Sequence, residues 1–183
     1  GTAASPPSLY ARPLRACPST RMPELPDAVV YERRVADAAL DRTIAGTTVV
    51  DPLILGDGVE PRRLDEVLTD RHLAETYRHG KHVFARYGDN TGWVALHFGM
   101  TGSVRVVENR DLSEYAYVQF HFQDGGHLSF RCPRKFARVR LIDRPEAFVE
   151  AKGLGPDARR ADVESFLLPF EGRRGTIKGR LLD

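Results

Sequence analysis

Pro23 and Glu24 lie side by side in RMPELPDAVV, residues 21–30, and could support covalent catalysis. If Met22 were the first residue and were removed, the Pro23 nitrogen would be a free secondary amine. An α-amino group has a pKa near ~8, so a useful fraction would be uncharged and nucleophilic at neutral pH. Such an amine can attack a sugar C1′ and form an iminium, while Glu24 moves protons. The residue types alone favour a plainer interpretation, a rigid entry into a helix.

Two further residues could contact nucleic acid. Lys81, in RHGKHVFARY, follows a glycine where a strand should start. A lysine at a hairpin tip is usually only solvated, but it is also a good phosphate ligand. Met100 lies between Gly99 and Thr101-Gly102, a spacing that predicts a tight turn. Taken alone, Met100 is expected to pack into the core. The alternative is an exposed apolar wedge of the kind that fills a distorted DNA base step.

Two basic segments extend this set. RCPRKFARVR, residues 131–140, holds five cations, and Arg134 lies two residues before Phe136. A charge run is usually a solvated face, but an aromatic side chain within it favours a nucleic-acid surface. GRRGTIKGR, residues 172–180, places cations that include Lys178 around the start of a predicted helix, where they would suit phosphate.

Composition limits the remaining classes. The 183 residues are 42% hydrophobic and 28% charged, as in ordinary globular proteins. The net charge is +2, and residues 1–21 carry three arginines and no acid, so the remainder carries 2 − 3 = −1. A DNA surface must therefore come from local clusters. No apolar run approaches the ~20 residues that span a bilayer. We expect no membrane association and a cytoplasmic location.

Metal and disulfide chemistry find little support. The six histidines form no i, i+4 pair on a predicted helix, and the two cysteines give neither a zinc spacing nor a disulfide framework. A reducing compartment is the expected environment. We expect no cofactor in this chain.

The patterns predict an α+β fold. A helical rhythm runs from Pro26 to Leu40, and about eight short β-type runs follow, separated by turn signals. They indicate an antiparallel β-sandwich of about eight strands with an N-terminal helix. After Gly153 the pattern turns helical again, with Asp157 as the expected cap. The predicted division is an extension at 1–21, which is disordered and of upstream or non-native origin, a catalytic sandwich domain at 22–150, and the start of a truncated helical DNA-binding domain at 151–183.

The order of the motifs resembles the formamidopyrimidine-DNA glycosylase and endonuclease VIII family. The motifs are MPELPD, HGK, HFGMTG, PRKF, GLGPD and GRRGTIKGRLLD, and they cover the chain from Met22 to Asp183. The resemblance implies an N-terminal β-sandwich, a helix–two-turn–helix region and a C-terminal zinc finger that would lie beyond this chain. It also implies base-excision repair: removal of an oxidised base from damaged double-stranded DNA, then strand cleavage as an AP lyase. The expected protein is a monomer.

The resemblance also implies roles for single residues. Pro23 matches the nucleophile that forms a Schiff base with C1′, and Glu24 matches the acid/base that assists sugar-ring opening. Lys81 matches a lysine at the scission-site phosphates, and Lys178 matches one beside the damaged nucleotide. The residues that match those filling the gap left by the flipped nucleotide are Met100, Arg134 and Phe136. This last set favours oxidised purines such as 8-oxoguanine or formamidopyrimidines.

Two departures keep alternatives open. Asp27 stands where the family pattern more often has glutamate, but the carboxylate is retained. While Arg21-Met22 remains bonded to Pro23, the Pro23 nitrogen is a tertiary amide and cannot react. One alternative is therefore a non-catalytic relative that binds damaged DNA. Another is an unrelated β-sandwich interaction module, which would show no salt-dependent DNA affinity.

Overall fold

The computed structural model describes residues 22–89, 91–108, 114–167, 170–172 and 176. Within these residues, eight strands form two four-stranded sheets, in which every neighbouring pair is antiparallel. Sheet I has the order β1-β6-β7-β5, with bounds Ile44–Val49, Ala116–Phe122, His127–Arg131 and Ser103–Val107. Sheet II has the order β2-β3-β4-β8, with bounds Leu73–His79, His82–Tyr87, Gly92–His97 and Arg138–Ile142. The predicted eight-stranded sandwich and the α+β class are confirmed.

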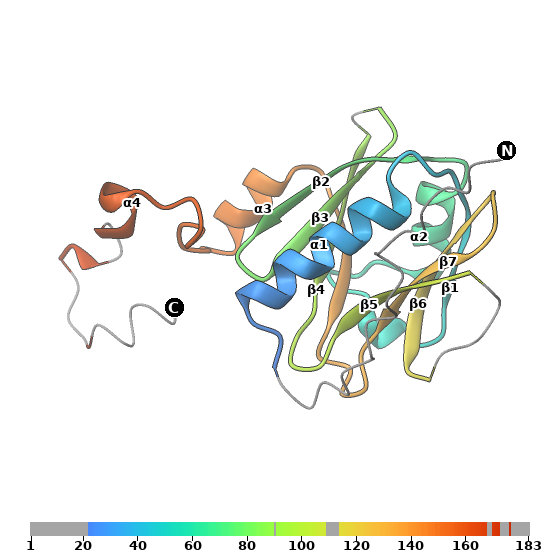
Figure 1. Cartoon of the computed structure of the whole chain (residues 1–183), viewed down its shortest axis with the longest axis horizontal. Helices are drawn as coiled ribbons and strands as arrows, with labels where there is room; N and C mark the ends of the chain where they lie inside the picture. The colour runs from blue at the N-terminus through green and yellow to red at the C-terminus, as the bar shows by residue number, and fades with distance from the viewer. Residues whose placement is uncertain (1–21, 90, 109–113, 168–169, 173–175, 177–183) are drawn as a thin grey trace, which may run out of the picture.

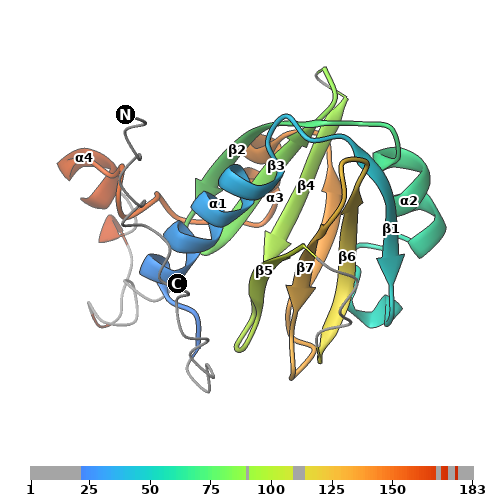
Figure 2. The same cartoon turned by 45° about the vertical axis from the view of Figure 1, so that its right-hand side comes forward.

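Helix α1, Leu25–Ala39, confirms the predicted N-terminal helix. Its buried face follows the helical repeat and includes Ala28, Tyr31 and Val35. The helix packs against β2 and β3 of sheet II and against β5 and β7 of sheet I. In Figures 1 and 2 it crosses the open side between the two sheets. The start of α1 is thereby fixed relative to both sheets.

Two helices among the described residues were not predicted from the sequence. Helix α2, Pro61–Leu68, starts at a proline and buries Leu64 and Leu68, spaced one helical turn apart. Helix α3, Pro145–Ala151, also starts at a proline and buries Phe148 against Phe84 on the outer face of sheet II. The one-turn 3-10 helix η1, Pro52–Ile54, precedes α2, and strands β2 to β8 lie between α2 and α3 in the chain. Both missed helices are short, so few periodic positions reveal them.

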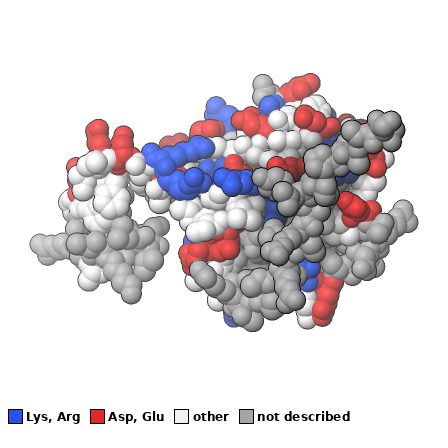
Figure 3. All heavy atoms as spheres, viewed as in Figure 1, with Lys and Arg blue, Asp and Glu red and all other residues white. Residues whose placement is uncertain are grey.

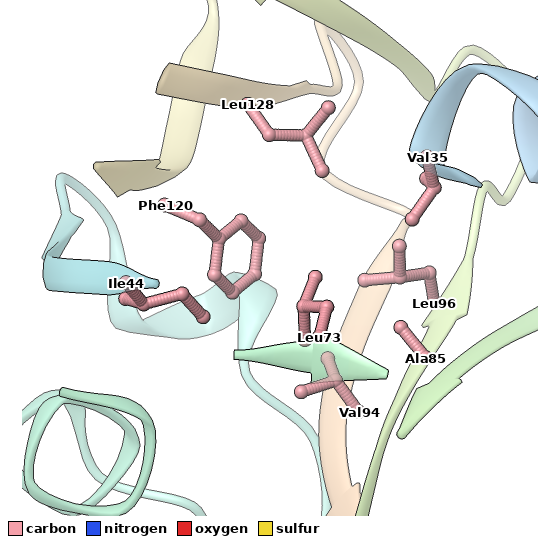
Figure 4. Close-up of a pocket in the computed structure, with 8 residues that line it drawn as sticks. All are labelled: Val35, Ile44, Leu73, Ala85, Val94, Leu96, Phe120 and Leu128. Atoms are coloured by element: carbon pink, nitrogen blue, oxygen red, sulfur yellow. The ribbon is translucent and has the colours of Figure 1, made fainter. Parts of the chain in front are cut away.

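The core lies between the sheets. Figure 4 shows its centre, where side chains from α1 and from both sheets point toward one another around a cavity of about 10 Å³. The lining is wholly apolar: Val35, Ile44, Leu73, Ala85, Val94, Leu96, Phe120 and Leu128. A space this small with no polar lining is a packing defect that stays dry. A space of this size is too small to bind a ligand.

The expected helix start at Asp157 is wrong. Helix α4 spans Val163–Leu167, and Asp162 caps it, since the Ser165 backbone N–H donates to Asp162 Oδ1 at 2.8 Å. Asp157 instead has a buried ion-pair partner, described below. Helix α4 lies outside the two sheets in both views (Figures 1 and 2). Among the described residues, no helix has the length and hydrophobicity needed to cross a bilayer.

Candidate functional site

The segment around Pro23 leads directly into α1. Glu24 precedes the helix, and its backbone N–H donates to Asp27 Oδ2 at 2.8 Å. Asp27 lies in the first turn, where a carboxylate also interacts favourably with the positive end of the helix dipole. Pro23 is buried, whereas the Glu24 side chain is 43% exposed. The aspartate at position 27 therefore fixes the backbone of Glu24, despite the departure from the family pattern.

Lys81 reaches the start of α1 from the tip of the β2–β3 hairpin. Its Nζ lies 3.0 Å from Glu24 Oε2. Only Gly80 and Lys81 connect β2 to β3, and Gly80 supplies the positive φ of +54° that such a tight turn requires. The fold thus brings Pro23, Glu24 and Lys81 together, although Lys81 is far from the other two in the sequence. We call these three residues the proline corner.

Two uncharged histidines lie behind Lys81. The ring centroids of His82 and His97 are 4.7 Å apart. Burial, together with nearby charged groups and His97, lowers the pKa of His82 to about 3. Burial also lowers the pKa of His97. Both rings are therefore neutral at physiological pH and add no positive charge beside Lys81.

Met100, Arg134 and Phe136 lie on two turns that touch. Gly99 packs so closely on the second turn that a Cβ there would be 2.5 Å from the Phe136 carbonyl carbon. The Arg134 backbone N–H donates to Thr101 Oγ1 at 3.3 Å. Met100 is 37% exposed and Phe136 is 51% exposed, so neither is tucked into the core. We call residues 99–102 and 133–136 the wedge turns.

One row of paired residues explains why these turns lie near the proline corner. His82, His97 and Arg138 pair in register across β3, β4 and β8. The turn that carries Lys81 precedes the row in β3, the turn that carries Met100 follows it in β4, and the second wedge turn precedes it in β8. Neighbouring strands lie about 4.8 Å apart, so these turns share one end of sheet II within roughly 15 Å.

The basic segment at 131–140 is less of a DNA surface than its composition suggests. Four of its five cations are already bound to other groups of the protein. Arg131 donates to the Glu114 carbonyl, Lys135 pairs with Asp51 at 2.6 Å, Arg138 donates to the carbonyls of Lys135 and Ala137, and Arg140 lies 2.8 Å from Asp57. Arg134 has no ion pair with any residue that the structure describes, and its guanidinium lies 5.4 Å from the Phe136 ring centroid. Arg134 is therefore the cation of this segment that is available to a ligand.

Lys178 lies outside the described residues, so its predicted role stays a prediction. Within the described residues, no group of three or more His, Cys, Asp or Glu side chains could hold a metal ion. Cys132 is buried and unpaired, and its Sγ accepts from the Ala137 N–H at 3.2 Å, which closes the base of the second wedge turn. This hydrogen bond gives Cys132 a structural role in the turn.

The sequence analysis missed Asp157 as a site residue. Its buried carboxylate pairs with Arg78 immediately before the Lys81 turn. The separation of the partners in sequence leaves no local signal, because no periodicity connects β2 with the segment after α3. The only sequence feature that pointed to Asp157 was its position in GLGPD, one of the motifs that carry the family resemblance.

Comparison with known proteins identifies the family to which this chain is similar. Residues 22–139 match the family described as "Formamidopyrimidine-DNA glycosylase N-terminal domain". The formamidopyrimidine-DNA glycosylase of Pelobacter propionicus is 31% identical over 166 residues, covering 88% of this chain and 60% of the relative. The enzyme of the same name from Lactobacillus johnsonii is 27% identical, covering 88% and 59%. The chain thus spans about three fifths of these relatives' length.

Solved structures agree with the fold. The Lactococcus lactis Fpg (MutM) in complex with DNA that contains N7-benzyl-Fapy-dG gives a TM-score of 0.77 at 24% identity, covering 87% of this chain and 60% of that one. A MutM complex with DNA that contains carbocyclic 8-oxo-G gives 0.76 at 23%, covering 87% and 61%. The family match extends over most of the sandwich that positions the proline corner and the wedge turns. The chain belongs to the formamidopyrimidine-DNA glycosylase family.

Proposed function

We propose that the protein containing this chain is a base-excision repair glycosylase that removes oxidised bases from double-stranded DNA and then cuts the strand as an AP lyase. The family match and the DNA-bound relatives of the same fold support this reading. We propose oxidised purines as the preferred substrates and a monomer as the working form. Any zinc finger would lie in a part of the protein beyond this chain.

The proposed covalent step uses Pro23 as the nucleophile. With Pro23 as the N-terminal residue, its amine attacks C1′ of the damaged nucleotide, and the bond from C1′ to the base breaks as the base leaves with the electron pair. Glu24 delivers a proton that assists sugar-ring opening, and an iminium forms between the Pro23 nitrogen and C1′. Loss of a proton from C2′ then drives β-elimination, in which the C3′–O bond breaks and the phosphate leaves with the electron pair. A second, δ-elimination breaks the C5′–O bond in the same way, and water hydrolyses the iminium to release the enzyme. The start of α1 favours the uncharged amine, since a helix N-terminus disfavours positive charge.

The wedge turns would make the target base reachable. A base inside a duplex must be extruded before an amine can reach C1′, at a cost of a few kcal/mol. Met100 and Phe136 are partly exposed apolar side chains on touching turns, and the Arg134 guanidinium lies over the Phe136 ring. They would fill the gap left in the stack, while Lys81 would hold a backbone phosphate near the scission site.

One observation carries this proposal most strongly. The Lys81 ammonium lies 3.0 Å from the carboxylate of Glu24, the residue that follows Pro23, and both wedge turns lie at the same end of sheet II. Nucleophile, proton carrier, phosphate ligand and wedge would thus share one surface. The competing proposal, a non-catalytic protein that binds damaged DNA, rests on a different observation, namely that Pro23 is preceded by Met22 in this chain.

Borohydride trapping separates the two proposals. The full-length protein, prepared with Pro23 as its first residue, is incubated with duplex DNA that contains 8-oxoguanine or an abasic site, and with borohydride. We expect a covalent adduct that is lost in Pro23→Gly and in a form that retains the residues before Pro23. DNA binding without an adduct, from a protein whose N-terminus is verified by intact mass, would refute the catalytic proposal and favour the binding one.

A further inference from the structure

We propose that Asp157 is a positioning residue that acts through Arg78 and Gly80 to hold Lys81 at the proline corner. The inference rests on the proposed function for the role of Lys81. It gives a function to GLGPD, a motif that the proposed chemistry does not use. The contact runs from the segment after α3 to the tip of the β2–β3 hairpin.

The Asp157 carboxylate is fully engaged and buried. The Arg78 guanidinium grips it with two bonds, Nη1 to Oδ2 at 2.5 Å and Nη2 to Oδ1 at 2.8 Å. The backbone N–H groups of Gly80 and Arg159 donate to it at 2.7 and 2.9 Å. The side chains of Arg78 and Asp157 are only 4% and 3% exposed. Such a pair has one well-defined geometry, because each lost bond would leave a charged group unsatisfied away from water.

The carboxylate holds the turn as well as the strand. Arg78 Nη1 also donates to the Gly80 carbonyl at 2.7 Å, so both backbone polar groups of Gly80 are bound to the Arg78–Asp157 pair. A second fastening is next to it, where His79 Nε2 lies 2.8 Å from the Gly155 carbonyl oxygen. Lys81 follows Gly80 directly, and its side chain is 44% exposed. The backbone that carries the partly exposed Lys81 side chain is thereby fixed from the interior side.

The same contact joins the hairpin to the segment between α3 and α4. An open pocket of about 210 Å³ lies beside this segment, lined by Glu32 of α1, Arg78 of β2, and Arg159 and Arg160. Figure 3 shows Lys and Arg side chains gathered on the surface around α3 and the segment that follows it. Arg160 is held over the Tyr77 ring at 4.9 Å in β2, so the segment is attached to β2 at a further point. A displacement of this segment would move the end of β2 and, with it, Lys81.

Burial raises the pKa of Asp157, but its hydrogen bonds with Arg78 and the backbone outweigh that effect and lower the pKa to about 2. The carboxylate is therefore charged throughout the pH range in which the enzyme would work. The contact is a constant structural support, and it is no proton carrier.

A double-mutant cycle with Lys81 tests the inference. The single-turnover rate of strand cleavage at an abasic site is measured for the parent, Asp157→Asn, Lys81→Ala and the double variant, all in the full-length protein that begins at Pro23. If Asp157 acts through Lys81, Asp157→Asn lowers the rate about tenfold in the parent and less than twofold in Lys81→Ala. Equal factors in both backgrounds would mean that Asp157 acts independently of Lys81, and would overturn the inference.

A binding measurement gives a second readout that does not need catalysis. The slope of log affinity against log salt, for duplex DNA with a stable abasic analogue, falls by about 0.9 for each lost phosphate contact. We expect Asp157→Asn and Lys81→Ala each to lower the slope by that amount, and the double variant to lower it no further. An unchanged slope in Asp157→Asn, with the expected fall in Lys81→Ala, would overturn the inference even if the parent forms no borohydride adduct and the proposed function fails.

Two further variants keep the test decisive. Arg78→Lys retains a cation opposite Asp157 but loses the bidentate hydrogen bonds. It should therefore fold even if Asp157→Asn does not. We expect smaller losses of cleavage rate and salt slope, which again disappear in the Lys81→Ala background. Asp124→Asn removes the exposed pair with Arg42, remote from the hairpin, and is the matched control. We expect that control to keep the parental rate and slope. Parental values in Arg78→Lys would count against the inference.

Discussion

The proline corner and the wedge turns are held by ion pairs of opposite kinds. Behind the proline corner, Arg78 and Asp157 are almost completely buried and every oxygen of the carboxylate is bonded. Beside the wedge turns, Lys135 and Asp51 are 44% and 18% exposed and make one contact at 2.6 Å. Under the proposed function, the chemical groups of the proline corner would need one fixed geometry, whereas the wedge side chains would insert into a DNA duplex whose shape changes. The backbone at the proline corner is thus held by a buried ion pair, whereas the wedge turns are held by a weaker, partly exposed one.

The largest expected effect on stability comes from breaking the buried pair. Asp157→Ala leaves the Arg78 guanidinium buried without its partner, and removing one member of such a pair costs about 3–5 kcal/mol. We expect the free energy of unfolding to fall by that amount in a chemical-denaturation experiment. A loss below about 1 kcal/mol would show that the region tolerates water, and the contrast with the wedge turns would disappear.

The pH dependence of that loss identifies the carboxylate as the cause. The folded-state pKa of Asp157, about 2, lies below the unfolded value near ~3.9, so the charged form stabilises the fold above ~3.9. This contribution is lost as the pH falls through about 2. The difference between the parent and Asp157→Ala should therefore be constant from pH 7 to about 5 and shrink below about 4. A difference that grows in acid would contradict this assignment.

Backbone contact between the wedge turns gives the next largest effect. Gly99 has φ +57°, and an added Cβ would be 2.5 Å from the Phe136 carbonyl carbon, so Gly99→Ala must push the turns apart. We expect a loss of about 1–3 kcal/mol in unfolding free energy, together with weaker binding to abasic-site DNA. Gly58→Ala is the control, because φ is +76° there but no heavy atom lies within 4 Å of the added carbon. Equal losses in both variants would mean that the turns do not depend on each other.

The sequence could predict the strands and the wedge residues but not what fixes them. The sequence segments that form β3, β4 and β8 either alternate apolar and polar residues or consist mostly of buried apolar residues. Local patterns therefore reveal these strands. The row that joins His82, His97 and Arg138 depends on strand order, which no local pattern encodes. Asp157 was expected to cap a helix because Asp commonly does so, but two bonds from Arg78 and two backbone donors hold it instead. Tertiary charge pairing overrode a local preference.

Likewise, counting cations overestimated the nucleic-acid surface. The segment at 131–140 has five positive side chains, yet only Arg134 lacks an ion pair or hydrogen bond from its side chain among the described residues. The acceptors for the other four include main-chain carbonyls and acids from elsewhere in the chain. Their positions follow from the fold, so composition could give the number of charges but not the number available to DNA.

A wedge side chain should matter for DNA distortion and little for folding. Phe136 is 51% exposed, so Phe136→Ala should change the unfolding free energy by less than about 1 kcal/mol. We expect it to weaken binding to duplex DNA with a stable abasic analogue about tenfold, because stacking by an aromatic side chain is lost. Val106→Ala is the matched control, since Val106 is 47% exposed on β5, away from the wedge turns. If both variants bind equally well, Phe136 is no wedge.

The exposed pair beside the wedge turns should give the smallest effect. Lys135, which lies between Arg134 and Phe136 in the chain, has φ +55°, a strained value for a residue with a side chain. Its ion pair with Asp51 stabilises this backbone conformation. This bond also lowers the pKa of Asp51, with help from the Leu53 N–H. Asp51→Asn should therefore reduce stability only slightly, and the reduction should vanish at high salt because exposed pairs are screened.

Lys135→Gly separates the role of the charge from that of the backbone. Glycine accepts a positive φ without strain, so this variant loses the pair but relieves the backbone, and the two effects on stability oppose each other. We expect it to be at least as stable as Asp51→Asn by chemical denaturation, and to bind abasic-site DNA more weakly because the second wedge turn is no longer held. Unchanged binding in both variants would show that the turn needs no clamp, so that its contact with Gly99 alone would order it.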